Sequence, residues 1–237
     1  AAARRTKPRR MSPKAFSTAA TDGRPETPTP VPDELTWAFT EAVWRSLPWA
    51  KTTWLGHRLA TAPTDLLAYQ EMISRVRPDW IIETGTGDGG RALFLSSICE
   101  LVGHGHVLSI DEDQPDDLPR HPRLQHIAGR PQDRATAKKA RAIVGHDARA
   151  LVILGSCGDR NTTTQEFEAY APLVPIGSYA VVAETIVNGH PVWPTFGDGP
   201  AEAVKQILTR HGDFVHDPGM VKYSFTFNPG GYLLRAR

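Results

Sequence analysis

From residue 80 onward, short apolar runs alternate with amphipathic stretches, and this alternation constrains the fold more than any other feature of the chain. The apolar runs predict strands at 80–84, 106–110, 124–127, 149–154 and 178–183. The stretches between them predict helices near 89–101, 132–144, 164–171 and 199–210. Nearly all-apolar strands separated by helices are typical of a parallel sheet that is covered on both faces. The sequence therefore predicts a doubly wound α/β fold with a mostly parallel sheet.

The C-terminal part departs from this rhythm. Residues 221–227 and 231–235 alternate apolar and polar side chains, and they flank Asn228-Pro229-Gly230, a sequence typical of a turn. We therefore expect an antiparallel C-terminal hairpin that closes the sheet.

Accessory helices are predicted ahead of the first core strand. The first spans 33–47, and the second ends at Pro78. Trp37 and Trp44 lie outside the apolar stripe of the first helix, which makes this helix a candidate interface in a homo-oligomer. The stripe itself consists of Leu35, Phe39, Val43 and Leu47.

Residues 1–32 contain seven Lys or Arg residues and two acids, but almost no large apolar side chains. Such a segment cannot offset the entropy cost of ordering, so we expect a flexible basic arm at 1–32. An Arg-rich, acid-poor segment is also typical of an organellar transit peptide. The remaining residues, 33–237, are expected to form a single domain, with accessory helices at 33–78 and the α/β core at 79–237.

Charge and composition exclude several classes of protein. The net charge is +1, and residues outside the arm carry −4, so the predicted domain offers no surface for nucleic acid. No apolar run approaches the roughly 18 residues that a membrane span needs. The two cysteines, Cys99 and Cys157, are too few for a disulfide framework. We expect two free thiols and a cytoplasmic protein.

A glycine-rich segment, Glu83-Thr84-Gly85-Thr86-Gly87-Asp88-Gly89-Gly90, follows the first core strand and precedes a helix. Glycines at this place let the backbone turn tightly and approach a ligand, while the amides of the helix N-terminus point toward it. Gly85, Gly87 and Gly90 fit the G-x-G-x-x-G pattern of dinucleotide-binding loops. The pattern alone is a weak signal for the ligand class.

Two acids favour S-adenosylmethionine over a dinucleotide. Glu83 lies two residues before the first glycine, where a carboxylate can hold the ammonium of an amino-acid-bearing ligand but would repel a pyrophosphate. Asp111 ends the second core strand, where an acid accepts hydrogen bonds from ribose hydroxyls. The antiparallel C-terminal pair points the same way. A nicotinamide-dependent oxidoreductase and a structural turn without a cofactor are the alternatives.

Motifs along the chain carry a family resemblance. In order, they include Trp54-Leu55-Gly56, Pro78-Asp79-Trp80-Ile81-Ile82-Glu83, Ser109-Ile110-Asp111, Asn188-Gly189-His190-Pro191 and Gly199-Pro200-Ala201-Glu202. This series resembles the cephalosporin hydroxylase and rhamnosyl O-methyltransferase family over about residues 50–235. The resemblance implies a Rossmann-like methyltransferase that uses S-adenosylmethionine. It also implies a small, glycosylated acceptor, methylated on a hydroxyl in natural-product or antibiotic biosynthesis. An S-adenosylmethionine-binding protein without methyl transfer is the alternative from another class.

The resemblance also implies cofactor contacts. It places Glu83, Gly85, Thr86 and Gly87 at the methionine end of the cofactor, Asp111 at the ribose, Gly129 and Arg130 at the adenine edge, and Gln70 where it helps to close the pocket.

The expected metal ligands are largely missing. Metal-dependent members of the family carry an Asp-His pair after the fourth core strand and a Glu-Asp pair after the fifth, whereas this chain has Cys157-Gly158 and Ala183-Glu184. Mg²⁺ requires several oxygen ligands, for which a thiol and a methyl group are poor substitutes. The sequence therefore favours a metal-independent enzyme. Asp159, two residues beyond Cys157, leaves a Mg²⁺ site open as the alternative.

Methyl transfer to a hydroxyl requires alignment of the acceptor and removal of its proton. Without a metal, a general base is the natural replacement, and the candidate catalytic residues are Asp159, Glu184 and His190. Histidine has an ordinary pKa suited to base catalysis near neutrality. Each candidate also has a structural interpretation: His190 as a loop histidine, Asp159 as the cap of a turn, and Glu184 as the acceptor of a loop amide.

Overall fold

The computed structural model describes residues 30–237, so the arm predicted at 1–32 lies outside the described residues except for its last three positions. The folded unit is Pro32–Arg237. Within the described part of the chain, no helix is both long and apolar enough to cross a lipid bilayer.

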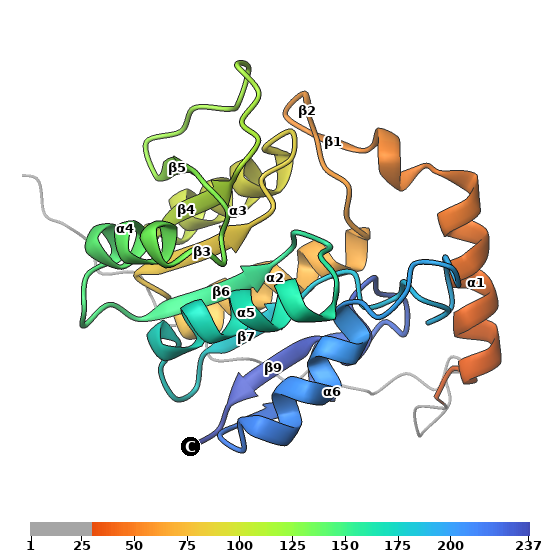
Figure 1. Ribbon diagram of the computed structural model, residues 1–237. Helices are drawn as coiled ribbons and strands as arrows, with labels where there is room; N and C mark the ends of the chain where they lie inside the picture. The colour runs from red at the N-terminus through yellow and green to blue at the C-terminus, as the bar shows by residue number, and fades with distance from the viewer. Residues whose placement is uncertain (1–29) are drawn as a thin grey trace, which may run out of the picture. The chain divides into compact units, whose positions relative to one another are not determined.

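A seven-stranded sheet with the order β5-β4-β3-β6-β7-β9-β8 forms the centre of this unit (Figure 1). Five strands are parallel, as predicted: β3 (Trp80–Thr84), β4 (His106–Asp111), β5 (Leu124–Ala128), β6 (Ala150–Leu154) and β7 (Tyr179–Val182). Successive strands are added on one side of β3 up to β5 and then on its other side from β6, which places the carboxyl ends of β3 and β6 at a topological switch point. Ligands bind beyond such a point in open α/β sheets.

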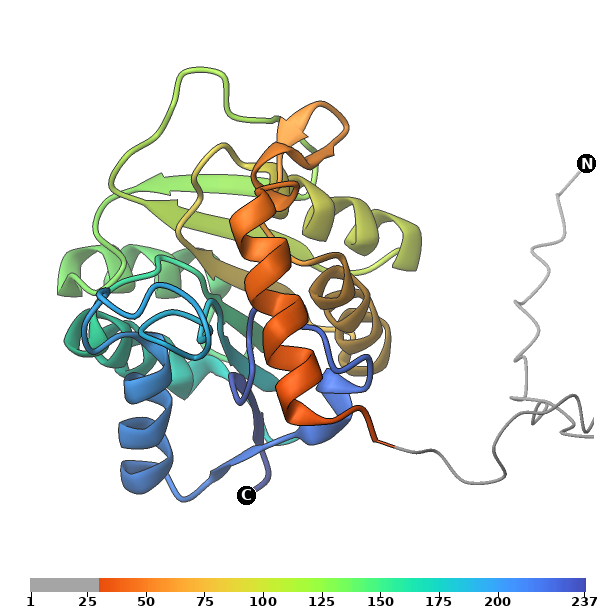
Figure 2. The same ribbon diagram turned by 90° about the vertical axis from the view of Figure 1, so that its right-hand side faces the viewer.

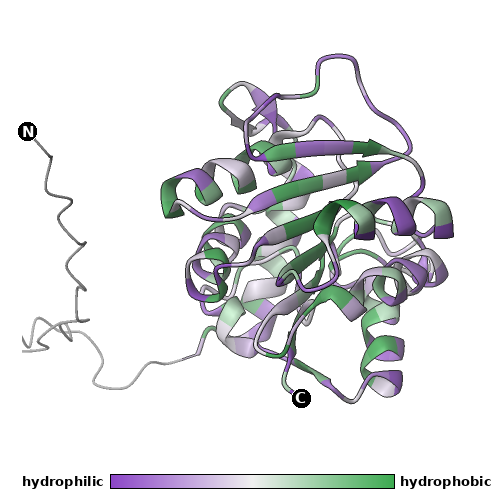
Figure 3. Cartoon of the chain, turned by 90° about the vertical axis from the view of Figure 1, so that its left-hand side faces the viewer, coloured by the Kyte–Doolittle hydropathy of each residue, from purple (hydrophilic) through white to green (hydrophobic). Residues whose placement is uncertain are grey.

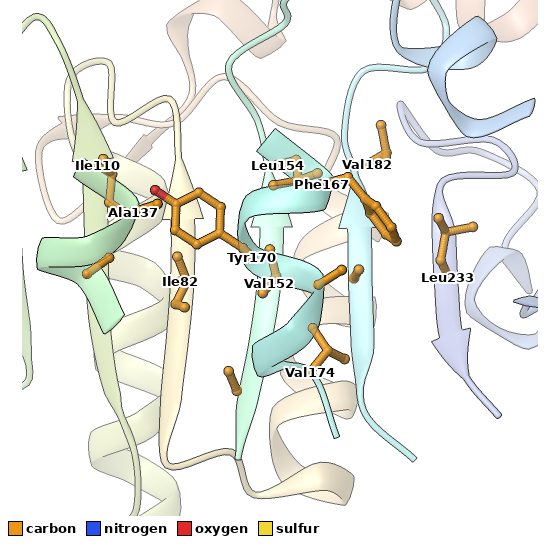
Figure 4. Packing of buried hydrophobic residues seen from close by; sticks show 14 of the residues in the cluster. Ile82, Ile110, Ala137, Val152, Leu154, Phe167, Tyr170, Val174, Val182 and Leu233 are labelled. Atoms are coloured by element: carbon orange, nitrogen blue, oxygen red, sulfur yellow. The ribbon is translucent and has the colours of Figure 1, made fainter. Parts of the chain in front are cut away.

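Helices cover both faces of the sheet, which confirms the doubly wound fold. The helices are α2 (Pro63–Val76), α3 (Gly90–Val102), α4 (Arg134–Val144), α5 (Arg160–Tyr170) and α6 (Pro200–Arg210). Neighbouring side chains of β3 point to opposite faces: Ile81 packs in the cluster beneath α2 and α3, and Ile82 in the cluster beneath α4, α5 and α6. Figure 4 shows Phe167 and Tyr170 of α5 directed at the strands. Figure 3 shows apolar residues concentrated in the strands.

The antiparallel C-terminal pair is present, but its first strand is not the predicted 221–227. Strand β9 (Tyr232–Arg235) pairs with β7 and with β8 (Phe214–His216), both antiparallel. The 221–227 segment is instead held by helix α2, because buried Asp65 accepts hydrogen bonds from the Thr226 hydroxyl and the Phe227 amide. Alternation along the sequence could not reveal this distant carboxylate.

Helix α1 (Asp33–Ser46) forms where the sequence predicts it and runs along one side of the unit (Figure 2). Its apolar stripe is packed only in part, because Leu35 is 60% exposed, whereas Phe39, which is 53% exposed, contacts the Phe225 ring edge-on. Trp44, outside the stripe, stacks on Trp49 and packs against a small apolar cluster instead. A two-stranded ribbon of β1 (Thr53–Trp54) and β2 (His57–Arg58) follows.

Candidate cofactor and methyl-transfer site

The glycine loop connects the carboxyl end of β3 to α3, where the sequence places it. Gly85 has φ +75°, and a Cβ at this position would lie 2.4 Å from the Gly155 carbonyl oxygen. The loop after β3 and the chain after β6 therefore approach each other so closely that only glycine fits. The candidate site lies where these two segments approach each other, at the switch point.

Two cavities meet at this approach, and Gly85, Gly87 and Gly155 line both. We name them the Asp111 cavity, of about 340 Å³, and the Glu184 cavity, of about 150 Å³. The charged residues that line the Asp111 cavity are Asp111, Glu112, Arg130 and Glu166. Those that line the Glu184 cavity are Arg58, Asp88, Arg91 and Glu184.

Several predicted cofactor residues come together in these cavities. Asp111 lies at the end of β4, and its carboxylate accepts a hydrogen bond from the Gly87 amide at 3.3 Å. Arg130 lines the same cavity and pairs with Glu112 at 3.2 Å. Thr86 lines the Glu184 cavity. Asp111, expected at the ribose, and Arg130, expected at the adenine edge, thus share one cavity.

Three predicted cofactor residues do not line either cavity. Gln70, on α2, is absent from both linings, and Gly129 packs against Thr136 of α4 instead. Glu83 is fully buried, and its two carboxylate oxygens accept hydrogen bonds from the Arg91 Nε at 2.5 Å and the Ser109 hydroxyl at 2.6 Å. Both carboxylate oxygens of Glu83 are thus engaged within the protein, and its expected contact with a ligand ammonium stays a prediction.

Arg91 is a site residue that the sequence interpretation missed. Its side chain lies in the first turn of α3, donates Nε to Glu83, and donates Nη2 to the carbonyl oxygens of Thr84 and Gly85 at 3.0 and 3.1 Å. A sequence signal existed, because a cation in the first turn of a helix opposes the helix dipole. Such a local conflict often marks a functional site.

Glu166 of α5 was also missed. One carboxylate oxygen accepts hydrogen bonds from the hydroxyls of Thr84 and Ser156, whereas the other is buried without a partner among the described residues. Burial raises the pKa of this carboxyl, and hydrogen bonds from Thr84 and Ser156 oppose that rise. No sequence signal marks this residue, because Glu166 lies at an ordinary helical position.

Of the three candidate bases, only Glu184 lines a cavity. Burial raises its pKa, and a hydrogen bond from the Cys157 thiol opposes the rise. Its backbone amide donates to the Asn228 side chain at 2.8 Å, which fixes the loop after β7. Cys157 and Cys99 are free thiols, as expected. Burial raises the pKa of Cys157, so this thiol stays protonated.

Asp159 and His190 have other partners and are absent from both cavity linings. Asp159 caps α5 by accepting from the Thr162 amide at 2.7 Å, and this bond lowers the pKa of its carboxyl. His190 lies 2.8 Å from a Glu202 carboxylate oxygen. Although burial opposes ionisation of Glu202, hydrogen bonds from the Gly199 amide and His190 lower its pKa to about 2.

The residues at the expected metal positions do not fit a divalent cation. Cys157 is a protonated thiol that donates to Glu184, and Asp159 is committed to its helix cap. The Arg91 guanidinium lines the same cavity as Glu184 and would repel a metal ion there. Across residues 30–237, no cluster of three or more His, Cys, Asp or Glu side chains is arranged to hold a metal.

Comparison with known proteins places the chain in one family. A curated rhamnosyl O-methyltransferase of Mycobacterium leprae is 33% identical over 193 residues, which cover 79% of this chain and 84% of that protein. The corresponding enzyme of Mycobacterium tuberculosis is 32% identical over 197 residues, which cover 80% of each chain.

Solved structures agree on the fold. A CmcI structure with Mg and SAM matches with a TM-score of 0.62 and 18% identity, over 90% of this chain and 88% of that one. An apo CmcI structure matches with a TM-score of 0.61 over the same shares. The family model described as Rhamnosyl O-methyltransferase/CmcI matches residues 47–236. The chain therefore belongs to the rhamnosyl O-methyltransferase/CmcI family, as the sequence motifs predict.

Proposed function

We propose that this protein transfers the methyl group of S-adenosylmethionine to a sugar hydroxyl of a small glycosylated natural product. The observation that carries the proposal is the pair of cavities joined at three glycines. S-adenosylmethionine is a nucleoside linked to an amino acid, so its two halves match two cavities that meet at one narrow approach. The rhamnosyl specificity in the names of the mycobacterial relatives supports a sugar as the acceptor.

The Asp111 cavity suits the nucleoside half. Asp111 accepts hydrogen bonds from the ribose hydroxyls, and Arg130 lies at the adenine edge. Three carboxylates and one guanidinium line this cavity, so its net charge is negative. A negative cavity favours a ligand with a positive sulfonium and disfavours the pyrophosphate of a dinucleotide.

The chemical step is an in-line displacement at the sulfonium methyl group. The acceptor oxygen forms a bond to the methyl carbon, the bond from carbon to sulfur breaks, and its electron pair stays on sulfur to give S-adenosylhomocysteine. Glu184 takes the proton of the acceptor hydroxyl, because it is the one candidate base that lines a cavity of the site. Burial raises the pKa of Glu184, which makes its carboxylate a stronger base than an exposed one.

The reaction proceeds without a divalent metal in this proposal. The support is the chemistry of the donor set: a protonated thiol at Cys157, a capping carboxylate at Asp159 and a guanidinium at Arg91. None of these groups suits a hard cation that requires several oxygen ligands.

The test is calorimetric titration of EDTA-treated protein with S-adenosylhomocysteine, with NADH as the control ligand. We expect binding of S-adenosylhomocysteine alone. Turnover is then measured with an aryl rhamnoside as the acceptor, through the formation of S-adenosylhomocysteine and of the methylated sugar. Binding of NADH alone would refute the proposal and return the glycine loop to the dinucleotide class. Cofactor binding without turnover on any glycosylated acceptor would favour a non-methylating protein.

A further inference from the structure

Arg91 has two N–H groups that donate no hydrogen bond, and its side chain lines the Glu184 cavity. Two of its three guanidinium nitrogens are engaged, Nε by Glu83 and Nη2 by the carbonyls of Thr84 and Gly85. The third nitrogen, Nη1, has no hydrogen-bond partner within residues 30–237. Arg91 is only 8% exposed, yet it lines the cavity. Because Arg91 lines the cavity, this nitrogen is free to donate to an acceptor that binds there.

The surroundings hold this guanidinium rigidly. The Glu83 carboxylate fixes one edge, and two carbonyls fix another. Gly155 leaves the necessary space, since a Cβ there would lie 2.0 Å from the Arg91 Nη2. A preorganised guanidinium loses little freedom on binding and matches the planar geometry of a carboxylate.

The charges of the cavity identify the kind of ligand group. Arg58 and Arg91 supply two positive charges, and Asp88 and Glu184 supply two negative charges. Arg58 already pairs with Asp88 at 2.5 Å, so the carboxylate largely neutralises the charge of Arg58. A cavity with balanced charges and one free guanidinium nitrogen suits a zwitterion whose carboxylate accepts a hydrogen bond from that nitrogen.

We propose that Arg91 binds the α-carboxylate of the amino-acid half of S-adenosylmethionine, through Nη1, in the Glu184 cavity. This inference rests on the proposed function, because it places the nucleoside half in the adjoining Asp111 cavity. Glu83 then acts as a positioning residue that orients the guanidinium and does not touch the ligand. The arrangement inverts the expectation from the glycine-loop motif, in which Glu83 itself contacts the ligand ammonium.

The experiment compares three ligands by calorimetry: S-adenosylhomocysteine, its decarboxylated analogue, and methylthioadenosine. The wild-type protein is expected to bind S-adenosylhomocysteine roughly 10- to 100-fold more tightly than the decarboxylated analogue, the range for one hydrogen bond to a charged group. In the double variant Glu83→Gln with Arg91→Gln, this preference should disappear. Methylthioadenosine, which lacks the amino-acid half, should bind both proteins equally.

Removing both partners avoids a lone buried charge, so the double variant is expected to fold. Arg91→Lys is the second variant, because it keeps a cation beside Glu83 and loses the planar fork; the preference should fall there too. The matched control is Glu100→Gln with Arg123→Gln, which removes a pair of the same type, also at 2.5 Å but outside both cavities.

The outcomes separate the two proposals. An undiminished preference for the carboxylate in the double variant and in Arg91→Lys overturns the inference and leaves the proposed function standing. Failure of the wild-type protein to bind any of the three adenosine ligands overturns both. Loss of the preference in the Arg91 variants, but not in the Glu100 and Arg123 control, supports the assignment.

Discussion

Two polar clusters in this protein differ in whether all of their hydrogen-bond donors and acceptors have partners. The first cluster, which we call the cavity floor, consists of Arg91 at the Glu184 cavity, Glu166 at the Asp111 cavity, and Glu83, which pairs with Arg91 and lines neither cavity. The C-terminal latch ties α2 to the chain before β9. It consists of Asp65, Tyr69, Thr226, Asn228 and Tyr232.

Every member of the latch has a partner. Asp65 accepts from Thr226, from the Phe227 amide and from the Tyr232 hydroxyl, and Asn228 donates to Tyr69 at 3.0 Å. The cavity floor, by contrast, leaves Nη1 of Arg91 and one oxygen of Glu166 without partners among the described residues. Complete pairing indicates a structural role, whereas polar groups at a cavity that lack partners indicate ligand binding.

The largest effect is expected when Glu184, the proposed base, is replaced. Glu184→Gln keeps the shape and removes the proton acceptor, so turnover should fall roughly 10²- to 10⁴-fold, far more than the affinity for S-adenosylhomocysteine falls. Initial rates and calorimetry measure the two quantities. Because burial raises the pKa of Glu184 and the base must be ionised, the wild-type rate should fall as the pH drops through that raised pKa. A Gln variant with wild-type turnover would exclude Glu184 as the base.

Removing the centre of the latch should affect stability and leave ligand binding intact. In Asp65→Ala, three buried donors lose their acceptor, and we expect the free energy of unfolding to fall by about 3 kcal/mol. Urea unfolding measures the change. The matched control is Glu71→Ala on the same helix, because Glu71 forms an exposed pair with Lys222 and its loss should hardly change stability. A large loss of cofactor affinity in folded Asp65→Ala protein would break the comparison.

The latch should also have a pH signature. Burial raises the pKa of Asp65 from 3.8 to about 6, despite hydrogen bonds that lower it. The folded protein thus keeps this proton to a higher pH than the unfolded chain does. Stability from this group is fully present below about pH 3.8 and is lost as the pH rises through about 6. The free energy of unfolding of the wild type, measured relative to that of Asp65→Asn, should therefore fall by up to roughly 3 kcal/mol between pH 4 and pH 7. A pH-independent difference would contradict this.

Replacement of Glu166 should change stability less than replacement of Asp65, and in the opposite direction. A buried carboxylate with an unpaired oxygen is costly, so Glu166→Gln should raise the free energy of unfolding by about 1 kcal/mol. The same variant should lose affinity for S-adenosylmethionine, whose sulfonium is positive, more than for neutral-sulfur S-adenosylhomocysteine. Thermal unfolding and paired titrations measure both. Unchanged relative affinity for the two ligands would remove Glu166 from the cofactor site.

The smallest expected effect concerns metal. If Arg91 is the fixed cation of the site, EDTA and added Mg²⁺ should each leave turnover unchanged. Parallel rate measurements on protein dialysed against chelator check this. Restoration of lost activity by Mg²⁺ alone would show that the donor set binds metal despite the protonated Cys157 thiol.

The order of elements and the location of the site could be predicted from the sequence. Strands of the parallel sheet are buried on both faces, so their apolar runs are visible without structural knowledge. The glycine loop and Asp111 were visible because strand ends in this fold converge on one edge of the sheet. The C-terminal strand was misplaced because β8 has only three residues and 221–227 alternates without pairing.

Roles that depend on contacts between distant residues could not be predicted. The sequence favours His190 or Asp159 as the proton acceptor, with Glu184 as a further candidate. Only packing after β6 and β7 brings Glu184 to a cavity, while Asp159 caps α5 and His190 pairs with Glu202. The sequence also does not reveal that Glu83 pairs with Arg91, because this contact depends on a side chain eight residues later that reaches back along the loop.

The sequence by itself determined the doubly wound fold, the cofactor loop and the family, because these depend on periodicity and on motifs of adjacent residues. The tertiary structure alone decided which charged groups have partners within the protein and which remain free to bind a ligand. Whether a buried carboxylate or guanidinium can bind a ligand depends on partners brought together from different strands and helices. Electrostatic and hydrogen-bond interactions act over a few ångströms in space, regardless of separation along the chain.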